Sequence, residues 1–359
     1  MKPLVSILIP SYNCEQWLAE TLESALAQTW QHKEIIVVDD GSTDNSLSVA
    51  KRFESSIVKV ISQENKGQSA AENRALREAQ GDFIQYLDAD DLLSPDKIDR
   101  QIKLLGDSNS EFLAAGEWSR FYKSPQEALF IPQPLWADFD PINWLIFAWE
   151  NHYMMHGAAW LVPRKIAEKA GGWDEKLSLI NDFDYFSRIL LASQGVKFCW
   201  GAKTYYRSGN SGSLSGSKSR SAWESAFLSL DKGTSNLLAR ENSPCTRHAC
   251  ATVFQRFIYE VYPNVSDLAQ KAEAKVKQFG GSNLKPDGGP IFQSLSHIIG
   301  WKSAKQIQKW VYQYGYSEVA LGWKLAKLKE RFVYRFSANS VRSSNHLNKN
   351  RNNLIDKNT

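Results

Sequence analysis

The sequence gives no sign of three features: a cysteine pattern for a structural metal, a signal peptide and a membrane-spanning helix. It has only 4 cysteines in 359 residues, and Cys245 and Cys250 have no second pair at metal-binding spacing, which argues against a structural zinc site. No leader precedes the apolar residues 5–10, so we expect no signal peptide. The most apolar long stretch, residues 142–162, contains Glu150 and two histidines and is too polar for a membrane-spanning helix. We therefore expect a cytoplasmic protein, at most peripheral on the inner face of the membrane.

The net charge of +4 conceals an uneven distribution. Residues 301–359 carry 12 Lys or Arg against 3 Asp or Glu, whereas the rest of the chain is net acidic. Residues 320–336 place an apolar stripe beside Lys and Arg on one helix, which is typical of a helix lying on an anionic membrane surface. Packing of this helix onto the rest of the protein is an equal alternative. No nucleic-acid partner is expected, because no recognised binding module accompanies the charge.

The first hundred residues alternate apolar strands with helices. Strands are expected at residues 5–10, 34–40, 58–62 and 83–88, and helices at 15–29, 44–53, 68–80 and 95–105. This order predicts an α/β fold with a mostly parallel central sheet flanked by helices. Less regular strands and helices follow to about residue 215, and the pattern from residue 222 is helical. Residues 337–359, rich in Asn, Ser and Lys, are predicted to be disordered.

Residues suited to ligand binding lie at the ends of three of the expected strands. They are Pro10, Tyr12 and Asn13 at the end of the first strand, Asp40 at the end of the second, and Asp88 and Asp90 at the end of the fourth. Ligands of parallel α/β sheets bind beyond the carboxyl ends of the strands. The sequence therefore predicts one ligand site at this edge of the sheet.

Asp88 and Asp90 are separated by one residue, so their carboxylates can share a hard divalent cation, Mg²⁺ or Mn²⁺, with open positions for phosphate oxygens. A helix-capping turn uses the same residue types, and the triplet alone leaves both interpretations open. Asp40 can accept hydrogen bonds from a base or ribose, and Asn73 and Arg74 can bring positive charge to a diphosphate. The alternative for Asp40 is an ordinary turn between strand and helix, and the alternative for Asn73 and Arg74 is a polar helix surface.

Together, the strings VSILIPSYN, VVDDGSTD, NKGQSAAENRAL and YLDADD resemble the donor half of family 2 glycosyltransferases, which have the GT-A fold. The resemblance is strong over residues 3–100. It continues more faintly through residues 171–175 and 181–184 to about residue 215.

This resemblance implies an inverting transfer from a nucleoside diphosphate sugar, first of all a UDP-sugar. The acceptor would be a hydroxyl of a glycan or lipid-linked molecule in cell-surface polysaccharide synthesis. Asp182 matches the base that activates the acceptor. The implied metal ligands are Asp88 and Asp90, and the implied donor-binding residues are Pro10, Tyr12, Asn13, Asp40, Gly67, Asn73, Arg74 and Asp88.

The domains expected from these patterns are a GT-A domain at residues 1–220, a helical extension at 221–336 that associates with membrane, and the basic tail at 337–359. The chain departs from the family in two places. Asn181 stands where the family usually has Glu, and Ser208 follows Arg207 where many relatives have His. His152 and His156 are candidates to replace that histidine, although a structural role is the simpler interpretation of each.

These departures leave open a second hypothesis, a non-catalytic relative that binds nucleotide sugars in a regulatory or scaffolding role. A third class, nucleotidyltransferases, would need a phosphate-binding loop rich in Gly and basic residues after the first strand. The segment PSYNCEQW is not such a loop.

Overall fold

The computed structural model describes residues 2–107, 110–209 and 216–313. Compact packing divides the chain into two units, Met1–Lys285 and Pro286–Thr359. In the second unit the described residues form helices α11 (Pro290–Ile299) and α12 (Trp301–Gln313), which pack against each other. The segment 320–336 and the tail 337–359 lie outside the described residues.

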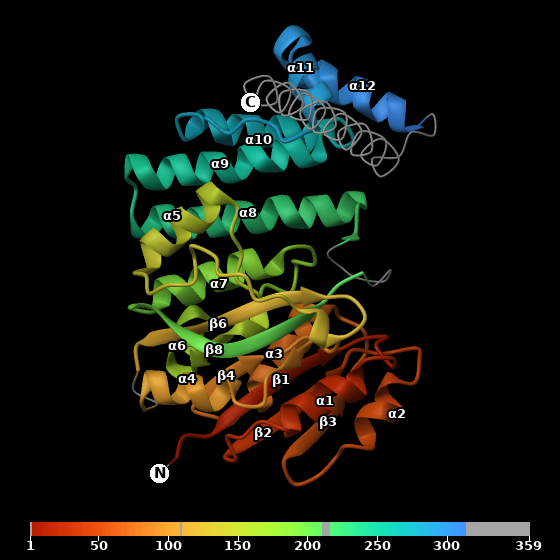
Figure 1. Ribbon diagram of the computed structural model, residues 1–359, viewed down its shortest axis with the longest axis vertical. Coiled ribbons are helices and arrows are strands. Elements are labelled where there is room, and N and C mark those ends of the chain that lie inside the picture. Colours follow the sequence, from red (N-terminus) through yellow and green to blue (C-terminus); the bar gives the residue numbers. More distant parts are fainter. Residues whose placement is uncertain (1, 108–109, 210–215, 314–359) are drawn as a thin grey trace, which may run out of the picture. The chain divides into compact units, whose positions relative to one another are not determined.

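A mixed sheet forms the centre of the first unit, with the strand order β3-β2-β1-β4-β7-β6-β8-β5 (Figure 1). As predicted, β1 (Val5–Ser11), β2 (Lys33–Asp39), β3 (Val58–Ser62) and β4 (Phe83–Tyr86) run parallel. Strand β7 (Trp160–Pro163) is antiparallel to both of its neighbours, β4 and β6 (Phe112–Phe121). Strand β8 (Gly195–Arg207) is parallel to β6, and the short β5 (Leu92–Leu93) is antiparallel to β8.

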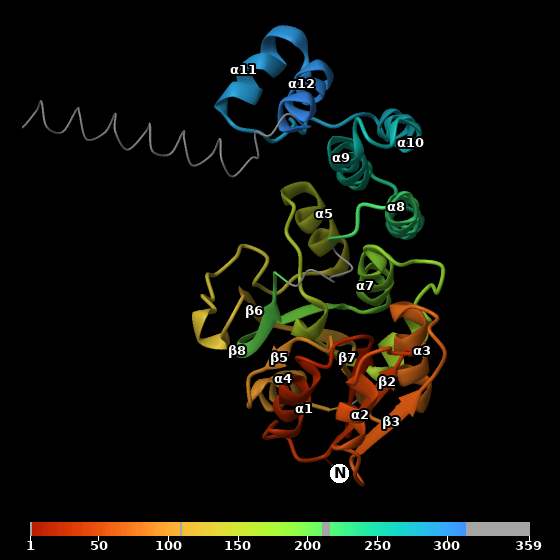
Figure 2. The same cartoon turned by 90° about the vertical axis from the view of Figure 1, so that its right-hand side faces the viewer.

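Helices cover both faces of the parallel half of the sheet (Figure 2). Helices α1 (Leu18–Leu26), α2 (Ser46–Lys51) and α4 (Lys97–Leu105) share one core with alternate residues of β1 and β2. Helix α3 (Gln68–Glu78) packs on the opposite face, and α6 (Arg164–Ala170) packs against β4 and β7. Every residue of β1 is buried. Burial on both faces explains why the strands are continuous apolar runs.

The helical region begins with α7 (Asn181–Ala192) and continues through α8 (Arg220–Arg240), α9 (Pro244–Val261) and α10 (Ser266–Gln278), each packed against the next (Figure 1). Helix α5 (Pro141–Asn151) packs against both α7 and α9. Helices α8 to α10 therefore belong to the first compact unit, so compact packing does not end at residue 220. The boundary at 220 remains a proposal about where the transferase domain ends.

The apolar stretch at residues 142–162 is not one helix. It comprises most of α5, a turn at His152 in the left-handed conformation, the short helix η2 (Gly157–Ala159) and most of β7. Among the residues that the structure describes, no helix is both long enough and apolar enough to cross a membrane.

Candidate functional site

The loops that follow β1 and β2 are tied together at the carboxyl edge of the sheet. Asn13, which has a φ of 48°, accepts hydrogen bonds from the backbone N–H and the hydroxyl of Thr43 at 2.8 and 3.2 Å. Its own N–H donates to the Ser42 hydroxyl. Pro10 is buried in β1, whereas Tyr12 is 51% exposed. Asn13 thus shapes this edge, and Tyr12 presents an open aromatic ring there.

Asp40 directly follows β2 and is buried. Its carboxylate accepts hydrogen bonds from the Gln63 side chain at 2.8 Å and from the backbone N–H groups of Lys66 and Gly67 at 3.0 and 2.7 Å. Gly67 has a φ of 90°, which glycine adopts without strain, and α3 begins at Gln68. Asp40 therefore positions the start of α3. A nucleotide base that contacts Asp40 would donate to the same carboxylate as these backbone N–H groups.

Asp88, Asp91 and His156 form a cluster just beyond β4. His156 Nε2 lies 3.0 Å from Asp91 Oδ2 and 3.9 Å from Asp88 Oδ2. One ligand atom from each residue lies within 4.8 Å of the other two. Gln68 Nε2 donates to Asp88 Oδ1 at 3.0 Å, which joins the start of α3 to the cluster. Asp91 and His156 are buried, whereas Asp88 remains partly open to solvent.

The antiparallel direction of β7 brings His156 to this cluster. Phe83 and Ile84 of β4 pair with Pro163 and Val162 of β7, so the residues that precede β7 lie beyond the carboxyl end of β4. His156 Nδ1 accepts a hydrogen bond from the N–H of Ala158 at 3.2 Å, which caps η2 and fixes the ring. Residue spacing alone gives no signal for this contact, because the direction of β7 is decided by packing.

Arg207, at the end of β8, holds the turn that contains the acids. Its backbone N–H donates to Asp91 Oδ1 at 2.8 Å, and its Nε donates to the carbonyl oxygen of Asp90 at 2.8 Å. Its guanidinium pairs with Glu20 of α1 at 2.6 Å. The Tyr206 ring lies against the His156 ring, with centroids 4.6 Å apart. The end of β8 therefore supports both the acids and the imidazole.

The cluster concentrates negative charge. Desolvation by the surrounding protein raises the pKa of Asp88 to about 6, and the charges of Asp91 and Asp182 add to this effect, whereas His156 opposes it. Burial alone would lower the pKa of His156, but Asp91, with Asp88 and Asp182, outweighs burial and raises it. Three carboxyl groups and one imidazole thus interact at this edge, and a cation would relieve their repulsion.

Asp182 is the second residue of α7, beside this cluster. It is open to solvent, yet desolvation by nearby protein raises its pKa, while the charge of His156 opposes the rise. Asn181 is buried; its Nδ2 donates to Ser69 Oγ on α3 at 3.0 Å, and its Oδ1 accepts from the Asp182 N–H at 3.0 Å. The asparagine at the position of the usual Glu therefore links α7 to α3.

Two residues predicted to bind the donor contact protein groups instead. Asn73 Oδ1 accepts from the N–H of Trp173 at 2.8 Å, and its Nδ2 donates to the Trp173 carbonyl and to Glu175, both at 2.9 Å. Arg74 pairs with Glu78 at 3.0 Å. Asn73 thus joins α3 to residues 173–175, and Arg74 pairs within α3, whereas Asp40, Gly67 and Asp88 lie at one edge of the sheet, with Asp182 beside them.

Of the two predicted metal ligands, Asp88 lies in the cluster. Within the described part of the chain, Asp90 does not belong to a group of acids and histidines close enough together to hold a metal ion. Asp91 Oδ2 is buried and accepts no well-aligned hydrogen bond from a described residue, although His156 approaches it. Two carboxylates and one imidazole within reach of one another are a donor set that fits a divalent cation. The imidazole argues for Mn²⁺ over Mg²⁺, which prefers an all-oxygen set.

The chain is similar to known glycosyltransferases. The family model described as Glycosyl transferase family 2 matches residues 6–171. An uncharacterized glycosyltransferase of Rickettsia typhi is 31% identical over 192 residues, which is 53% of this chain and 60% of that protein. A Bacillus subtilis protein named as a teichuronic acid biosynthesis glycosyltransferase is 37% identical over 118 residues, which is 32% of this chain and 47% of that protein. Chondroitin synthase of Escherichia coli is 44% identical over 99 residues, 27% of this chain and 14% of that protein. The chain thus spans at most 60% of the length of these three relatives.

Two solved structures share the fold at low sequence identity. S. aureus TarS 1–349 in complex with UDP-GlcNAc has a TM-score of 0.55 at 18% identity, covering 77% of this chain and 88% of that one. The mannosyltransferase PcManGT from Pyrobaculum calidifontis, in complex with GDP-Man and Mn²⁺, has a TM-score of 0.52 at 17% identity, covering 90% and 83%. At such identities the likeness concerns the fold alone.

Proposed function

Residues 6–171 form a family 2 glycosyltransferase domain with the GT-A fold, and we propose that the chain is an inverting enzyme. It would transfer a sugar from a nucleoside diphosphate sugar to a hydroxyl of a glycan or lipid-linked acceptor. One observation supports this proposal: Asp182, at the start of α7, is close enough to the cluster of Asp88, Asp91 and His156 to shift the pKa values of Asp88 and His156. A binding-only protein would have no need of a carboxylate at that position.

In this proposal the loops after β1 and β2 and the start of α3 hold the nucleotide. Tyr12 offers a ring for the base, Asp40 offers a carboxylate for base or ribose groups, and Gly67 lets the backbone approach the donor closely. Pro10 and Asn13 set the shape of the first loop. A UDP-sugar is the first donor to test, because TarS was solved with UDP-GlcNAc; GDP-mannose is the second, because PcManGT was solved with it.

We assign the cation site to Asp88, Asp91 and His156, with Mn²⁺ as the preferred ion. A bound ion would neutralise the diphosphate as it leaves. Asp90 adjoins the cluster, and its carboxylate remains a candidate for an added ligand when the donor binds. His156 would supply the imidazole that relatives place after the equivalent of Arg207.

Asp182 would act as the base. A carboxylate with a raised pKa near the reacting carbon can take the proton of the acceptor hydroxyl as its oxygen attacks. An attack from the side opposite the leaving diphosphate inverts the configuration at that carbon. Without a cation the charge of His156 opposes this rise in pKa, and a bound cation in place of that charge would likewise favour the ionised form of Asp182.

The relatives named for teichuronic acid and chondroitin synthesis support a role in polysaccharide synthesis. The basic residues after 301 support a peripheral position on an anionic membrane, where a lipid-linked acceptor would be found.

The experiment is a donor panel. Purified protein is incubated with UDP-glucose, UDP-galactose, UDP-GlcNAc or GDP-mannose, with Mn²⁺ or with EDTA, and the released nucleoside diphosphate is measured. We expect release from at least one donor with Mn²⁺ and its loss in EDTA. Absence of both binding and release with every donor would refute the proposal.

A further inference from the structure

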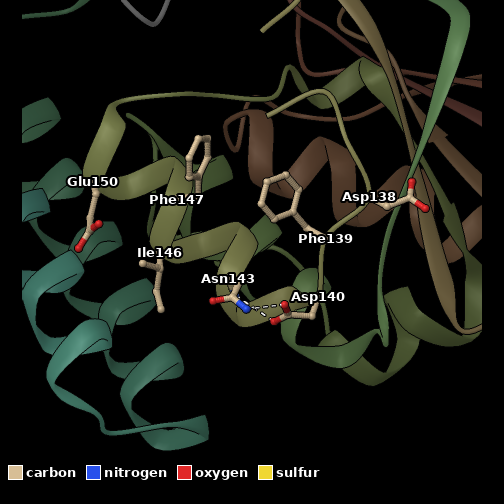
Figure 3. Close-up of a pocket in the computed structure, with 7 residues that line it drawn as sticks. All are labelled: Asp138, Phe139, Asp140, Asn143, Ile146, Phe147 and Glu150. Carbon is tan, nitrogen blue, oxygen red and sulfur yellow. Dashed lines mark hydrogen bonds between the residues drawn. The ribbon is translucent and has the colours of Figure 1, made fainter. Parts of the chain in front are cut away.

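A separate pocket of about 440 Å³ opens beside α5, within the size range of small-molecule sites (Figure 3). Its lining comes from the segment before α5 and from one side of that helix. The lining residues are Asp138, Phe139, Asp140, Asn143, Ile146, Phe147 and Glu150. The pocket is not part of the donor site, because Phe139 pairs with Val196 near the start of β8, whereas Arg207 ends that strand at the acid cluster.

Aromatic rings form the apolar part of the pocket. The rings of Phe139 and Phe147 have centroids 5.7 Å apart and are tilted by 33°. The ring of Phe147 also stacks on Tyr153, with centroids 5.7 Å apart, which fixes its orientation. Both phenylalanines are half-buried, so part of each ring remains accessible. Accessible aromatic faces carry negative potential and attract the C–H groups of a sugar ring.

Hydrogen-bonding groups surround these rings. Asp140 accepts hydrogen bonds from the backbone and side-chain N–H groups of Asn143 at 3.0 and 2.6 Å (Figure 3). Asp138 accepts from Lys197 and from the backbone N–H of Phe198, each at 2.8 Å. Each carboxylate oxygen has two acceptor positions, so both aspartates keep acceptors for hydroxyl groups. Partial burial opposes their ionisation, but these hydrogen bonds prevail and lower the pKa of both carboxyl groups.

Fixed aromatic faces beside oriented carboxylate and amide groups match a ring with apolar C–H faces and equatorial hydroxyls. We propose that this pocket binds a sugar unit of a neutral glycan, as an accessory subsite for an acceptor chain that has already been elongated. The inference rests on the proposed function, since it assumes a glycan acceptor. Neutral glycans are favoured over anionic ones, because the lining holds three carboxylates against one lysine, Lys197 on Asp138, and one histidine, His248 on Glu150.

Helix α5 connects this subsite to the transfer site. Glu150 lines the pocket near the end of α5, and its neighbour Trp149 stacks on Phe183 with ring centroids 4.8 Å apart. Phe183 directly follows Asp182, the proposed base. The proposal predicts that a glycan long enough to extend from the pocket to Asp182 is a better acceptor than a short one.

The test measures binding of hexasaccharides by calorimetry to the full chain without donor. Chitohexaose, cellohexaose, maltohexaose and mannohexaose are the neutral probes, and a chondroitin hexasaccharide is the anionic one. We expect at least one neutral probe to bind and Phe147→Ala to weaken its binding by about tenfold or more. Asn143→Arg, at an exposed position that tolerates change, should do the same by filling the pocket. Ile57→Ala, an exposed apolar residue just before β3, is the control and should bind as wild type does.

Donor hydrolysis is measured in parallel and should be unchanged in both pocket variants. Binding without any donor hydrolysis would support the pocket while refuting the transferase proposal. Donor hydrolysis with no neutral probe bound at millimolar concentration would overturn the pocket assignment alone. Equal binding of the chondroitin probe, or wild-type binding by both pocket variants, would also overturn it.

Discussion

At the scale of single residues, Asp88 lowers the stability of the folded protein when its carboxyl group is ionised. Its carboxyl group has a pKa of about 6, above the value of roughly 4 for an unfolded chain, because the fold desolvates it and surrounds it with other acids. The folded state therefore binds its proton more tightly than the unfolded state does. Stability falls as the pH rises from about 4 to about 6, and the full cost persists above pH 6.

We predict that Asp88→Asn raises the melting temperature of the metal-free protein at pH 7.5. The gain should vanish at pH 4, where the wild-type group is protonated as well. Thermal unfolding in EDTA at both pH values measures this, with the surface variant Asp99→Asn as the control, since Asp99 pairs with Lys103 on the same helix. A lower melting temperature for Asp88→Asn at pH 7.5 would contradict the electrostatic argument.

His156 carries a second prediction at this scale. His156→Gln should weaken Mn²⁺ binding by roughly tenfold or more, because it removes one of three proposed ligands. Titration of Mn²⁺ followed by electron paramagnetic resonance measures the free ion directly and needs no turnover. His152→Asn, at an exposed turn, should bind Mn²⁺ as wild type does. Unchanged affinity in a folded His156→Gln protein would remove His156 from the site.

At the level of elements, helix α3 carries two residues that were predicted to bind the donor, Asn73 and Arg74, and they have different protein partners. Asn73 makes three hydrogen bonds with residues 173–175, so Asn73→Ala should lower the free energy of unfolding by about 2 kcal/mol. Arg74 forms an exposed pair with Glu78, and Arg74→Ala should cost less than about 0.5 kcal/mol. Urea unfolding measures both. If Asn73→Ala instead keeps wild-type stability and raises only the KM for the donor, the original donor-binding assignment is correct.

The strands show which elements a sequence can predict. Strands β1 and β2 were predictable because each contains a continuous apolar run that the fold buries on both faces, and β4 is fully buried as well. The edge strand β3, in which Lys59 and Ser62 are exposed, was predictable from its place in the alternation of strands and helices. The two residues of β5 are too few for any periodic pattern, and the antiparallel direction of β7 depends on packing with β4 and β6. That direction brings His156 to Asp88 and Asp91. The sequence offered His156 only as one of two candidate histidines and could not place it against these acids.

At the scale of the whole molecule, the chain divides into units at residues 285 and 286. We predict that a chain ending at Lys285 keeps the donor hydrolysis of the full chain but no longer sediments with vesicles containing phosphatidylglycerol. The expected reason is the loss of the basic residues beyond 301. Vesicles of phosphatidylcholine alone are the control for non-specific binding. Equal sedimentation of both chains with the anionic vesicles would refute a membrane role for this region.

The central claim is that one edge of the sheet binds a nucleotide sugar and that Asp182 performs the transfer there. The most direct measurement compares donor binding and turnover in Asp182→Asn and wild type, with Mn²⁺ and the donor identified by the panel. We predict that the variant binds the donor within about threefold of wild type, while its turnover falls by roughly 10²- to 10⁴-fold, the range of a lost general base. Wild-type turnover by a folded Asp182→Asn protein would contradict the account.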